Sequence, residues 1–372
     1  MDLLALIRRL MEDGTIRSIA NNPLAQFTES QRRARIYLGA QLLPERQTEN
    51  DFTDFGIRYR TVIANDGSRY SPAQLKSDEG LVGSVKVSVG HSDIARQFTG
   101  RDYDLFLALL RTRPELEAVT RLLDWTDITI NRALLDLNEK QRWQAFVAAS
   151  VVRKGDNGYN ETVAYPNPSG HRVAAGGDWA SDAYDPLVDL QAGVDKLAEK
   201  GYNVSRMVGS TRTSRLLARN AKMRERAAAT LLVGTDGTIS GRPPTRLAPA
   251  ALNAILQAEG FPALETYDEQ YRDYEGAHRF LDQDALVMFA TTGRDEMTTA
   301  AEFDESGQFD VLTDTLGYTA IGRPVGESDS GRVIRMWPFD NKPPRIEAEG
   351  WQASIPVITE PEALFVITGI GE

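Results

Sequence analysis

Alternating hydrophobic and polar positions predict a pair of strands in the first quarter of the chain. Apolar, aromatic or β-branched side chains occupy every second position over 55–63 and again over 85–89. A period of two is typical of β-strands, and the turn-forming residues 65–68 (NDGS) between them predict an extended hairpin. An isolated two-stranded ribbon is only marginally stable in water. No neighbouring segment offers a face to cover it, so the pattern indicates an arm that packs on another molecule, as in a protein that works by assembly.

A helical period follows the hairpin. Seven apolar residues fall on or near one stripe of a helix that begins at Thr126: Ile130, Leu134, Leu137, Trp143, Phe146, Val147 and Val151. Arg153, Lys154 and Gly155 are the cations and glycine that helix C-termini favour, so the helix is expected to end there. A helix of about 25 residues spans close to 40 Å. The pattern therefore predicts a long spine across which other elements lie.

The remaining patterns predict a second lobe of mixed helices and strands. The chain of 372 residues exceeds what one core usually supports, so two lobes are expected. Residues 156–184 are rich in Gly, Asn, Pro and Ser and predict a connector. Asp185 as N-cap and Pro186 at the first helical position predict a helix that ends at 200–201. The further expected elements are helices at 211–226 and 249–260 and strands at 203–208, 264–271, 285–290, 317–320, 333–337, 351–358 and 364–370.

Composition excludes several classes of chemistry. The chain has no cysteine, which rules out disulfides, thiolate zinc sites and a cysteine nucleophile. Its three histidines, His91, His171 and His278, lie far apart in sequence and are expected to be surface or structural residues. A net charge of −11 argues against nucleic-acid binding as the main task, because that task needs a basic face. No apolar run reaches the roughly 20 residues that cross a bilayer, and no secretory signal is present, so a cytoplasmic location is expected.

One segment resembles a phosphate site. Residues 208–214 (VGSTRTS) lead from a predicted strand into a predicted helix, where backbone N–H groups and the positive helix end can hold an anion. The segment matches neither the Walker pattern nor the dinucleotide fingerprint. The favoured alternative is a helix capped by serine or threonine.

Acidic residues are the other candidates for chemistry. The acidic clusters are Asp268-Glu269, Asp282 and Asp284, Asp295-Glu296, and Asp304-Glu305. They lack EF-hand spacing and an adjacent base, so a solvated acidic face is favoured. No Gly-x-Ser-x-Gly motif is present. The sequence therefore predicts no enzyme, no cofactor, and no catalytic, cofactor-binding or metal-ligating residue.

The order of the elements resembles the HK97-type major capsid protein of tailed bacteriophages, particularly the branch of the lambda major capsid protein. Residues 124–152 resemble the spine helix of that family, including the stretch 139–143 (EKQRW). Residues 185–207 resemble the first helix and strand of its axial domain, and residues 336–370 are similar to its closing strands. The resemblance covers nearly the whole chain and rests on element order more than on an invariant motif.

This resemblance implies an α+β capsid fold whose hexamers and pentamers form an icosahedral shell around phage DNA, assembled in the host cytoplasm. The implied parts are an N-terminal arm (1–50), an E-loop hairpin (51–92), a peripheral domain with the spine helix (93–180 and 317–372) and an axial domain (181–316). The implied partners are other copies of the chain, scaffold, portal and decoration proteins, and double-stranded DNA by non-specific contact, with no membrane.

Alternatives remain beside this interpretation. An encapsulin-like nanocompartment shell has the same fold, and a phosphate- or nucleotide-binding enzyme would use Gly209–Ser214. Some family members cross-link subunits through a lysine and an asparagine assisted by a carboxylate. Lys76 or Lys86, Asn341 and Glu347 are the matching residue types here, and cross-linking is not favoured. A separate scaffold, or none, is expected because only about 50 residues precede the hairpin.

Overall fold

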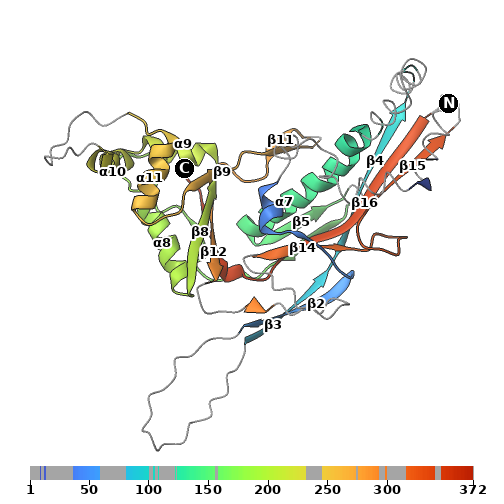
Figure 1. The fold of residues 1–372 in the computed structure, drawn as a ribbon, viewed down its shortest axis with the longest axis horizontal. Helices are drawn as coiled ribbons and strands as arrows, with labels where there is room; N and C mark the ends of the chain where they lie inside the picture. Colours follow the sequence, from blue (N-terminus) through green and yellow to red (C-terminus); the bar gives the residue numbers. More distant parts are fainter. Residues whose placement is uncertain are drawn as a thin grey trace, which may run out of the picture. The chain divides into compact units, whose positions relative to one another are not determined.

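The computed structural model divides the chain into two compact units. The first comprises Met1–Asp54, Lys86–Arg142 and Gly317–Val357, and the second comprises Phe55–Val85, Trp143–Leu316 and Ile358–Glu372. The structure describes residues 9, 12–13, 37–58, 81–99, 104, 108, 122, 124–155, 158–231, 245–273, 275–292, 298–299, 316–339 and 345–371. The mixture of helices and strands is the predicted α+β class (Figure 1).

A five-stranded sheet forms the frame of the first unit. Its strand order is β1-β14-β16-β15, and β4 also pairs with β16. The strands are β1 (Glu45–Gln47), β4 (Gly90–Thr99), β14 (Gly317–Gly322), β15 (Arg332–Phe339) and β16 (Arg345–Ile358). β16 lies between two antiparallel neighbours, so that Trp351 pairs with Val333 of β15 and with Asp93 of β4. The prediction started this strand at Trp351; it starts at Arg345, because alternate residues from Ile346 are buried although charged residues separate them.

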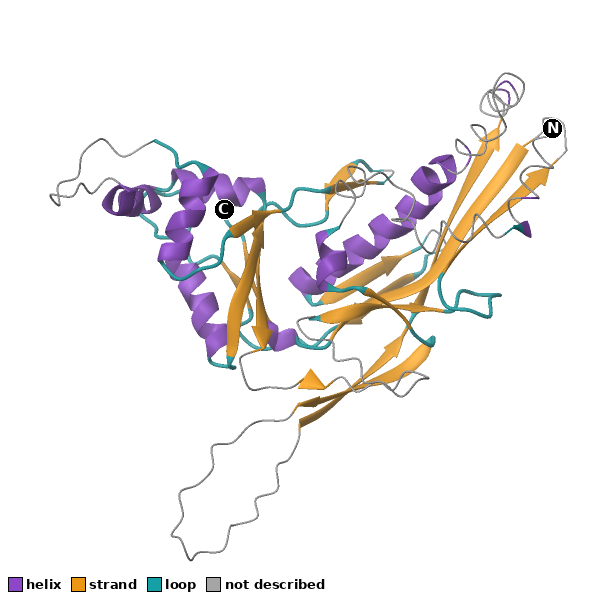
Figure 2. Cartoon of the chain, viewed as in Figure 1, coloured by secondary structure: helices purple, strands orange, loops and turns teal. Residues whose placement is uncertain are grey.

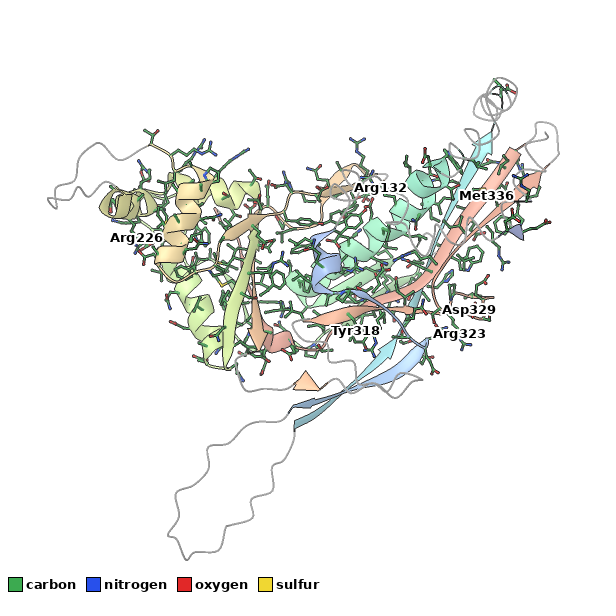
Figure 3. The ribbon with its side chains drawn as sticks, viewed as in Figure 1. Arg132, Arg226, Tyr318, Arg323, Asp329 and Met336 are labelled. Carbon is green, nitrogen blue, oxygen red and sulfur yellow. The ribbon has the colours of Figure 1, made fainter. Side chains whose placement is uncertain are left out.

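A loop after β14 is tied to the residues that precede the hairpin. Arg323 N–H donates to the Asn50 side chain at 2.6 Å, and the Asn50 amide donates back to the Arg323 carbonyl at 3.0 Å. The Ser330 hydroxyl donates to the Thr48 carbonyl at 2.9 Å. Figure 3 shows Arg323 and Asp329 on this loop, beyond Tyr318 of β14. These bonds anchor the start of β2 to the first unit.

The predicted hairpin is confirmed at its base. β2 (Asp51–Arg58) and β3 (Leu81–Ser88) are neighbours in a small sheet of order β13-β2-β3. The third strand, β13 (Thr298–Thr299), pairs with β2 at Ile57 and Arg58. The prediction of an uncovered ribbon is therefore wrong in one respect, because a distant segment adds a strand. The remaining hairpin positions over 59–63, and the tip, lie outside the described residues.

The predicted spine helix is confirmed in its body and wrong at its end. Helical residues run without interruption from Asp124 through a π-helical stretch, η2 (Asp127–Asn131), into α7 (Arg132–Ala148), and Leu122 is helical as well. Ala149 has a φ of +49°, a left-handed conformation that stops the helix. The two following valines are β-branched and favour a strand. They form β5 (Ser150–Lys154), which pairs with β6 (Asn160–Ala164).

The second unit is built on a mixed sheet with strand order β7-β17-β12-β8-β9. Figure 2 draws the strands in orange and the helices in purple. The strands are β7 (Arg172–Ala174), β8 (Tyr202–Gly209), β9 (Leu264–Thr266), β12 (Leu286–Thr292) and β17 (Leu364–Thr368). The helices of this unit are α8 (Leu187–Ala198), α9 (Thr211–Arg219), α10 (Ala221–Leu231) and α11 (Pro249–Ala258). Helix α8 packs on β8 and β17. Because β6 and β7 fall within residues 156–184, that segment is structured and the prediction of a plain connector is wrong.

Local side chains explain where the helices of the second unit begin and end. The Asp185 carboxylate accepts a hydrogen bond from Leu187 N–H at 3.1 Å, as its predicted capping role requires. The single helix predicted over 211–226 is two helices, because Asn220 adopts an extended conformation with ψ 135°. The Asn220 amide nitrogen lies 3.0–3.2 Å from three carbonyl oxygens between Trp179 and Tyr184. The strand predicted over 264–271 is also divided, into β9 and β10 (Gln270–Arg272), and β10 pairs with β11 (Ala277–Arg279).

The remaining elements of the described chain are short. Helix α4 (Leu38–Leu42) precedes β1, and a 3₁₀ turn, η3 (Pro361–Ala363), leads into β17. The prediction of an arm over 1–50 is only partly within the described residues. Its C-terminal part, from residue 37 onward, lies on the first unit through α4 and β1.

Candidate functional site

The segment Gly209–Ser214 forms a capped helix start. Ser210 is the N-cap of α9: its hydroxyl oxygen accepts from Thr213 N–H at 3.0 Å and donates to the Gln283 carbonyl at 2.6 Å. The carboxylate of Asp268 accepts from Thr211 N–H at 3.1 Å, at the position where a phosphate would bind. The chain therefore satisfies this helix end with its own side chains, as the capped-helix alternative predicted.

The acidic residues next to this helix are held by arginines. Asp284 pairs with Arg212, and Asp268 pairs with Arg279. Within the described part of the chain, no group of three or more His, Asp or Glu side chains could hold a metal ion. The acidic pairs at 295–296 and 304–305 lie outside the described residues. Among the helices that are described, none is long and apolar enough to cross a membrane.

The residues matched to a cross-link are not brought together by the described structure. Glu347 lies on β16, where its carboxylate accepts from the Gln97 amide of β4 at 3.5 Å. Lys86 lies on β3. Lys76 and Asn341 are outside the described residues. Cross-linking through these residues stays a prediction.

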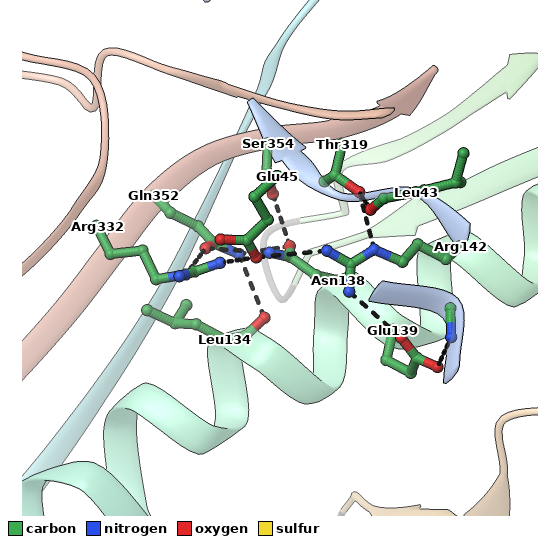
Figure 4. A network of polar contacts seen from close by, with 11 residues as sticks. Leu43, Glu45, Leu134, Asn138, Glu139, Arg142, Thr319, Arg332, Gln352 and Ser354 are labelled. Atoms are coloured by element: carbon green, nitrogen blue, oxygen red, sulfur yellow. Dashed lines mark hydrogen bonds and ion pairs between the residues drawn. The ribbon is translucent and has the colours of Figure 1, made fainter. Parts of the chain in front are cut away.

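The most extensive polar arrangement of the first unit is a buried cluster between α7 and the sheet (Figure 4). Arg142 is 1% exposed and lies between two carboxylates: its Nη1 is 3.3 Å from Glu139, and its Nη2 is 3.4 Å from Glu45. Glu45 also pairs with Arg332, which is 3% exposed. Glu139 is fully buried, and its second oxygen accepts from Gly39 N–H at 2.8 Å. Two buried guanidinium groups thus balance two carboxylates, that of the fully buried Glu139 and that of Glu45, whose side chain is 33% exposed.

Neutral side chains complete this polar cluster. Arg332 Nε donates to the side-chain oxygen Oε1 of Gln352 at 2.8 Å, and the Gln352 side-chain amide donates to Asn138 Oδ1 at 2.7 Å. The Ser354 hydroxyl donates to the same Asn138 oxygen at 2.8 Å. On the other side, Arg142 Nε donates to the Thr319 hydroxyl at 2.8 Å. The cluster therefore joins α7 to β1, β14, β15 and β16 and holds these five elements in one arrangement.

Comparison with known proteins identifies the family of this chain. Residues 96–368, well over half of the chain, match the family model of phage major capsid protein E. The chain belongs to this family of phage capsid proteins. It is a structural, non-enzymatic subunit of a phage capsid, as the resemblance implied. No curated protein matches the sequence.

Solved structures show that this capsid protein has an HK97-like fold. A crystal structure described as a prophage capsid protein of Escherichia coli CFT073 superposes with a TM-score of 0.57 at 15% identity, covering 93% of this chain and 96% of that chain. A phage-related protein from Bordetella bronchiseptica RB50 superposes with a TM-score of 0.51 at 14% identity, covering 95% and 97%. At such identities, the likeness concerns the fold.

Sequence reasoning missed the buried polar cluster of the capsid protein. One signal was present: Leu134, Asn138 and Arg142 follow one another at spacings of four, so polar residues continue an apolar face of α7. Glu45, Arg332 and the other sheet residues carry no comparable signal.

The Glu45 carboxylate is expected to make the stability of the capsid protein depend on pH. Burial alone would raise the pKa of the Glu45 carboxyl, but the guanidinium groups of Arg332 and Arg142 outweigh burial and lower this pKa. A carboxyl with a lowered folded-state pKa stabilises the fold above the unfolded pKa of about 4.3, and this stabilisation is lost as the pH falls through the folded pKa. The Glu45→Gln variant is therefore expected to be less stable than wild type at neutral pH, with a difference that shrinks in acid.

Urea unfolding of Glu45→Gln and wild type between about pH 7 and about pH 3 measures this difference. The exposed Glu275 supplies the matched control: Glu275→Gln is expected to leave stability nearly unchanged at every pH. If the difference in the free energy of unfolding between Glu45→Gln and wild type stayed constant over this pH range, the lowered pKa of Glu45 would be contradicted.

Proposed function

We propose that this chain is the shell-forming subunit of a tailed phage, assembling with copies of itself into hexamers and pentamers of a closed icosahedral capsid. The observation that carries the proposal is the match of residues 96–368 to the phage major capsid protein family. The same match favours a phage capsid over a cellular nanocompartment. Assembly in the host cytoplasm completes the proposal.

The net charge of the chain supports a shell that encloses DNA but binds it only weakly. A net charge of −11 offers few cations to replace the counterions of DNA. Contacts with packaged double-stranded DNA are therefore non-specific and weak. Portal and decoration proteins are further partners in this proposal.

The hairpin is the part of the chain proposed to reach the neighbouring subunit. Its base is tied to the first unit by the bonds of Thr48 and Asn50 with the loop after β14. Its strands carry an alternating apolar pattern over 55–63, and burying such a face contributes roughly 25 cal/mol per Å². In a closed shell every copy repeats the contact. The apolar face of the hairpin therefore supplies an assembly contact.

Replacing Ile57 and Tyr59 by aspartate is expected to block assembly and leave a folded, soluble subunit, because the charges would be buried only in the shell. Sedimentation velocity measures assembly, and circular dichroism measures folding. Arg58→Asp is the matched control, because neighbouring strand residues point to opposite faces. The control is expected to assemble. Loss of the soluble subunit in the Ile57→Asp/Tyr59→Asp variant would count against a role in assembly.

A further inference from the structure

One segment of the second unit is strongly basic in an otherwise acidic chain. Residues 211–226, which form α9 and the first part of α10, contain six cations and one carboxylate, whereas the whole chain has a net charge of −11. Four of these cations pair with a carboxylate: Arg212 with Asp284, Lys222 with Glu225, Arg224 with Asp182 and Arg226 with Asp185. The two that remain are Arg215 and Arg219.

Arg215 and Arg219 lie on the outer face of α9. They are four residues apart, so they share one stripe of the helix and are separated by about 6 Å along its axis. The opposite face of α9 is buried through Thr213, Leu217 and Ala218. Both arginines are exposed, and no carboxylate of the described residues pairs with either of them. Helix α9 therefore presents two uncompensated guanidinium groups to the solvent.

Two further arginines extend this exposed face at the C-terminal end of α9. Arg224 of α10 donates from Nε to the Arg219 carbonyl at 3.0 Å, so its side chain lies against the last turn of α9. Arg246 is exposed and precedes Leu247, whose N–H group donates to the Ala218 carbonyl at 3.0 Å. The four residues of this arginine surface are Arg215, Arg219, Arg224 and Arg246.

The chemistry of the arginine surface fits phosphate groups. A guanidinium group is planar and always charged, and its N–H groups suit bidentate contact with phosphate oxygens. Duplex DNA carries one negative charge per about 1.7 Å of its axis, so clustered arginines meet phosphates at any register. The acidic residues beside α9, Asp268 and Asp284, are already held by arginines of the same chain. A second copy of the chain therefore offers fewer free anions than DNA does.

We propose that the arginine surface of α9 and α10 is the place where this subunit contacts the phosphate backbone of packaged double-stranded DNA. The inference rests on the proposed function, because a shell subunit meets DNA inside the particle. Charges act over about 10 Å at 0.1 M salt, so the local excess of arginine decides the contact although the whole chain is acidic. The contact is independent of base sequence, because bonds to phosphate carry no sequence information.

Binding of a DNA duplex to the unassembled subunit tests the proposal. The full-length chain with Ile57→Asp/Tyr59→Asp is expected to stay unassembled, so its whole surface is open to DNA. Fluorescence anisotropy of a labelled duplex of about 30 base pairs measures the affinity over a range of salt concentrations. Adding Arg215→Gln/Arg219→Gln is expected to weaken binding about tenfold or more at about 50 mM salt. The slope of log affinity against log salt concentration is expected to become shallower by about 2.

Lys196→Gln/Lys200→Gln is the matched control, because it also removes two positive charges from the second unit. These lysines lie at the end of α8 and in the turn after it, and β8 separates them from the start of α9 by about 26 Å. The control is expected to change the affinity for the duplex less than about twofold. If the Ile57→Asp/Tyr59→Asp background does not fold, the same variants are titrated in the otherwise wild-type chain, below the concentration at which sedimentation velocity detects particles.

Three results would overturn the proposal. The first is an equal loss of affinity in the two double variants, and the second is a folded, unassembled subunit that binds no duplex at about 50 mM salt. The third is an otherwise wild-type Arg215→Gln/Arg219→Gln chain that loses particles while its duplex affinity stays unchanged, because the surface would then serve a contact between copies. Failure of the shell-forming role is a separate observation, since it is the absence of particles from the wild-type chain.

Discussion

Arg142→Leu is expected to lower the free energy of unfolding by about 3–5 kcal/mol, because it leaves the fully buried Glu139 carboxylate without its cation. Glu139 is fully buried and still accepts from Gly39 N–H, and Glu45 still pairs with Arg332. Thr319 also loses the donor that reaches its hydroxyl at 2.8 Å. Urea unfolding followed by circular dichroism measures the loss.

Two further variants separate a buried-charge effect from the mere loss of an arginine. Removing both charges in Glu139→Leu/Arg142→Leu is expected to give a protein more stable than Arg142→Leu alone, because no uncompensated Glu139 charge remains. Lys196→Met breaks an exposed pair with Glu199 and is expected to cost less than about 1 kcal/mol. A double variant that is less stable than Arg142→Leu would contradict the account of the cluster.

Trp143→Ala is expected to lower the free energy of unfolding of the second unit by about 3–5 kcal/mol, because it opens a large cavity in a packed aromatic core. Trp143 is fully buried. Its ring stacks on Tyr267 with centroids 5.0 Å apart and forms T-shaped pairs with Phe146 and Phe289, whose ring centroids lie 5.6 and 6.4 Å away. Aromatic pairs of this kind add to the effect of burial alone.

Urea unfolding followed by far-ultraviolet circular dichroism is the suitable measurement, because the substitution removes a fluorophore. Trp337→Ala is the matched control, since Trp337 on β15 is 37% exposed. Trp337→Ala is expected to lower the free energy of unfolding by about 1 kcal/mol or less. If Trp143→Ala and Trp337→Ala lowered the free energy of unfolding equally, Trp143 would not be part of a tightly packed core.

Neighbouring residues of α7 thus serve different units of the molecule. Arg142 belongs to the first unit and Trp143 to the second. The apolar stripe on this helix was readable from the sequence, because Ile130, Leu134 and Phe146 recur at helical spacing and are all buried. The sequence could not predict that Arg142 and Trp143 belong to different units, because this depends on elements that are distant in sequence.

Element ends were the least predictable part of the fold, for physical reasons that are visible at two positions. α7 stops at Ala149 because the valines that follow gain a partner strand in β6, a pairing that local propensity does not reveal. The helix predicted over 211–226 breaks at Asn220, where three carbonyls of the preceding loop surround the amide nitrogen. By contrast, Asp185 and Gly260 mark helix boundaries through local chemistry and were predicted correctly.

The buried cluster was out of reach of sequence reasoning because its charges come from three separate parts of the chain: Glu45 on β1, Glu139 and Arg142 on α7, and Arg332 on β15. Glu45 meets Arg332 because β1 joins β14, which lies in the same sheet as β15 and β16. That strand order follows from tertiary packing. The family, however, could be predicted, since it rests on element order, and the match over residues 96–368 confirms it.

Electron microscopy of the purified full-length chain, expressed alone, tests the central claim most directly. The account predicts uniform closed particles built from this chain. A homogeneous soluble monomer that binds nucleotide through Gly209–Ser214 would contradict it.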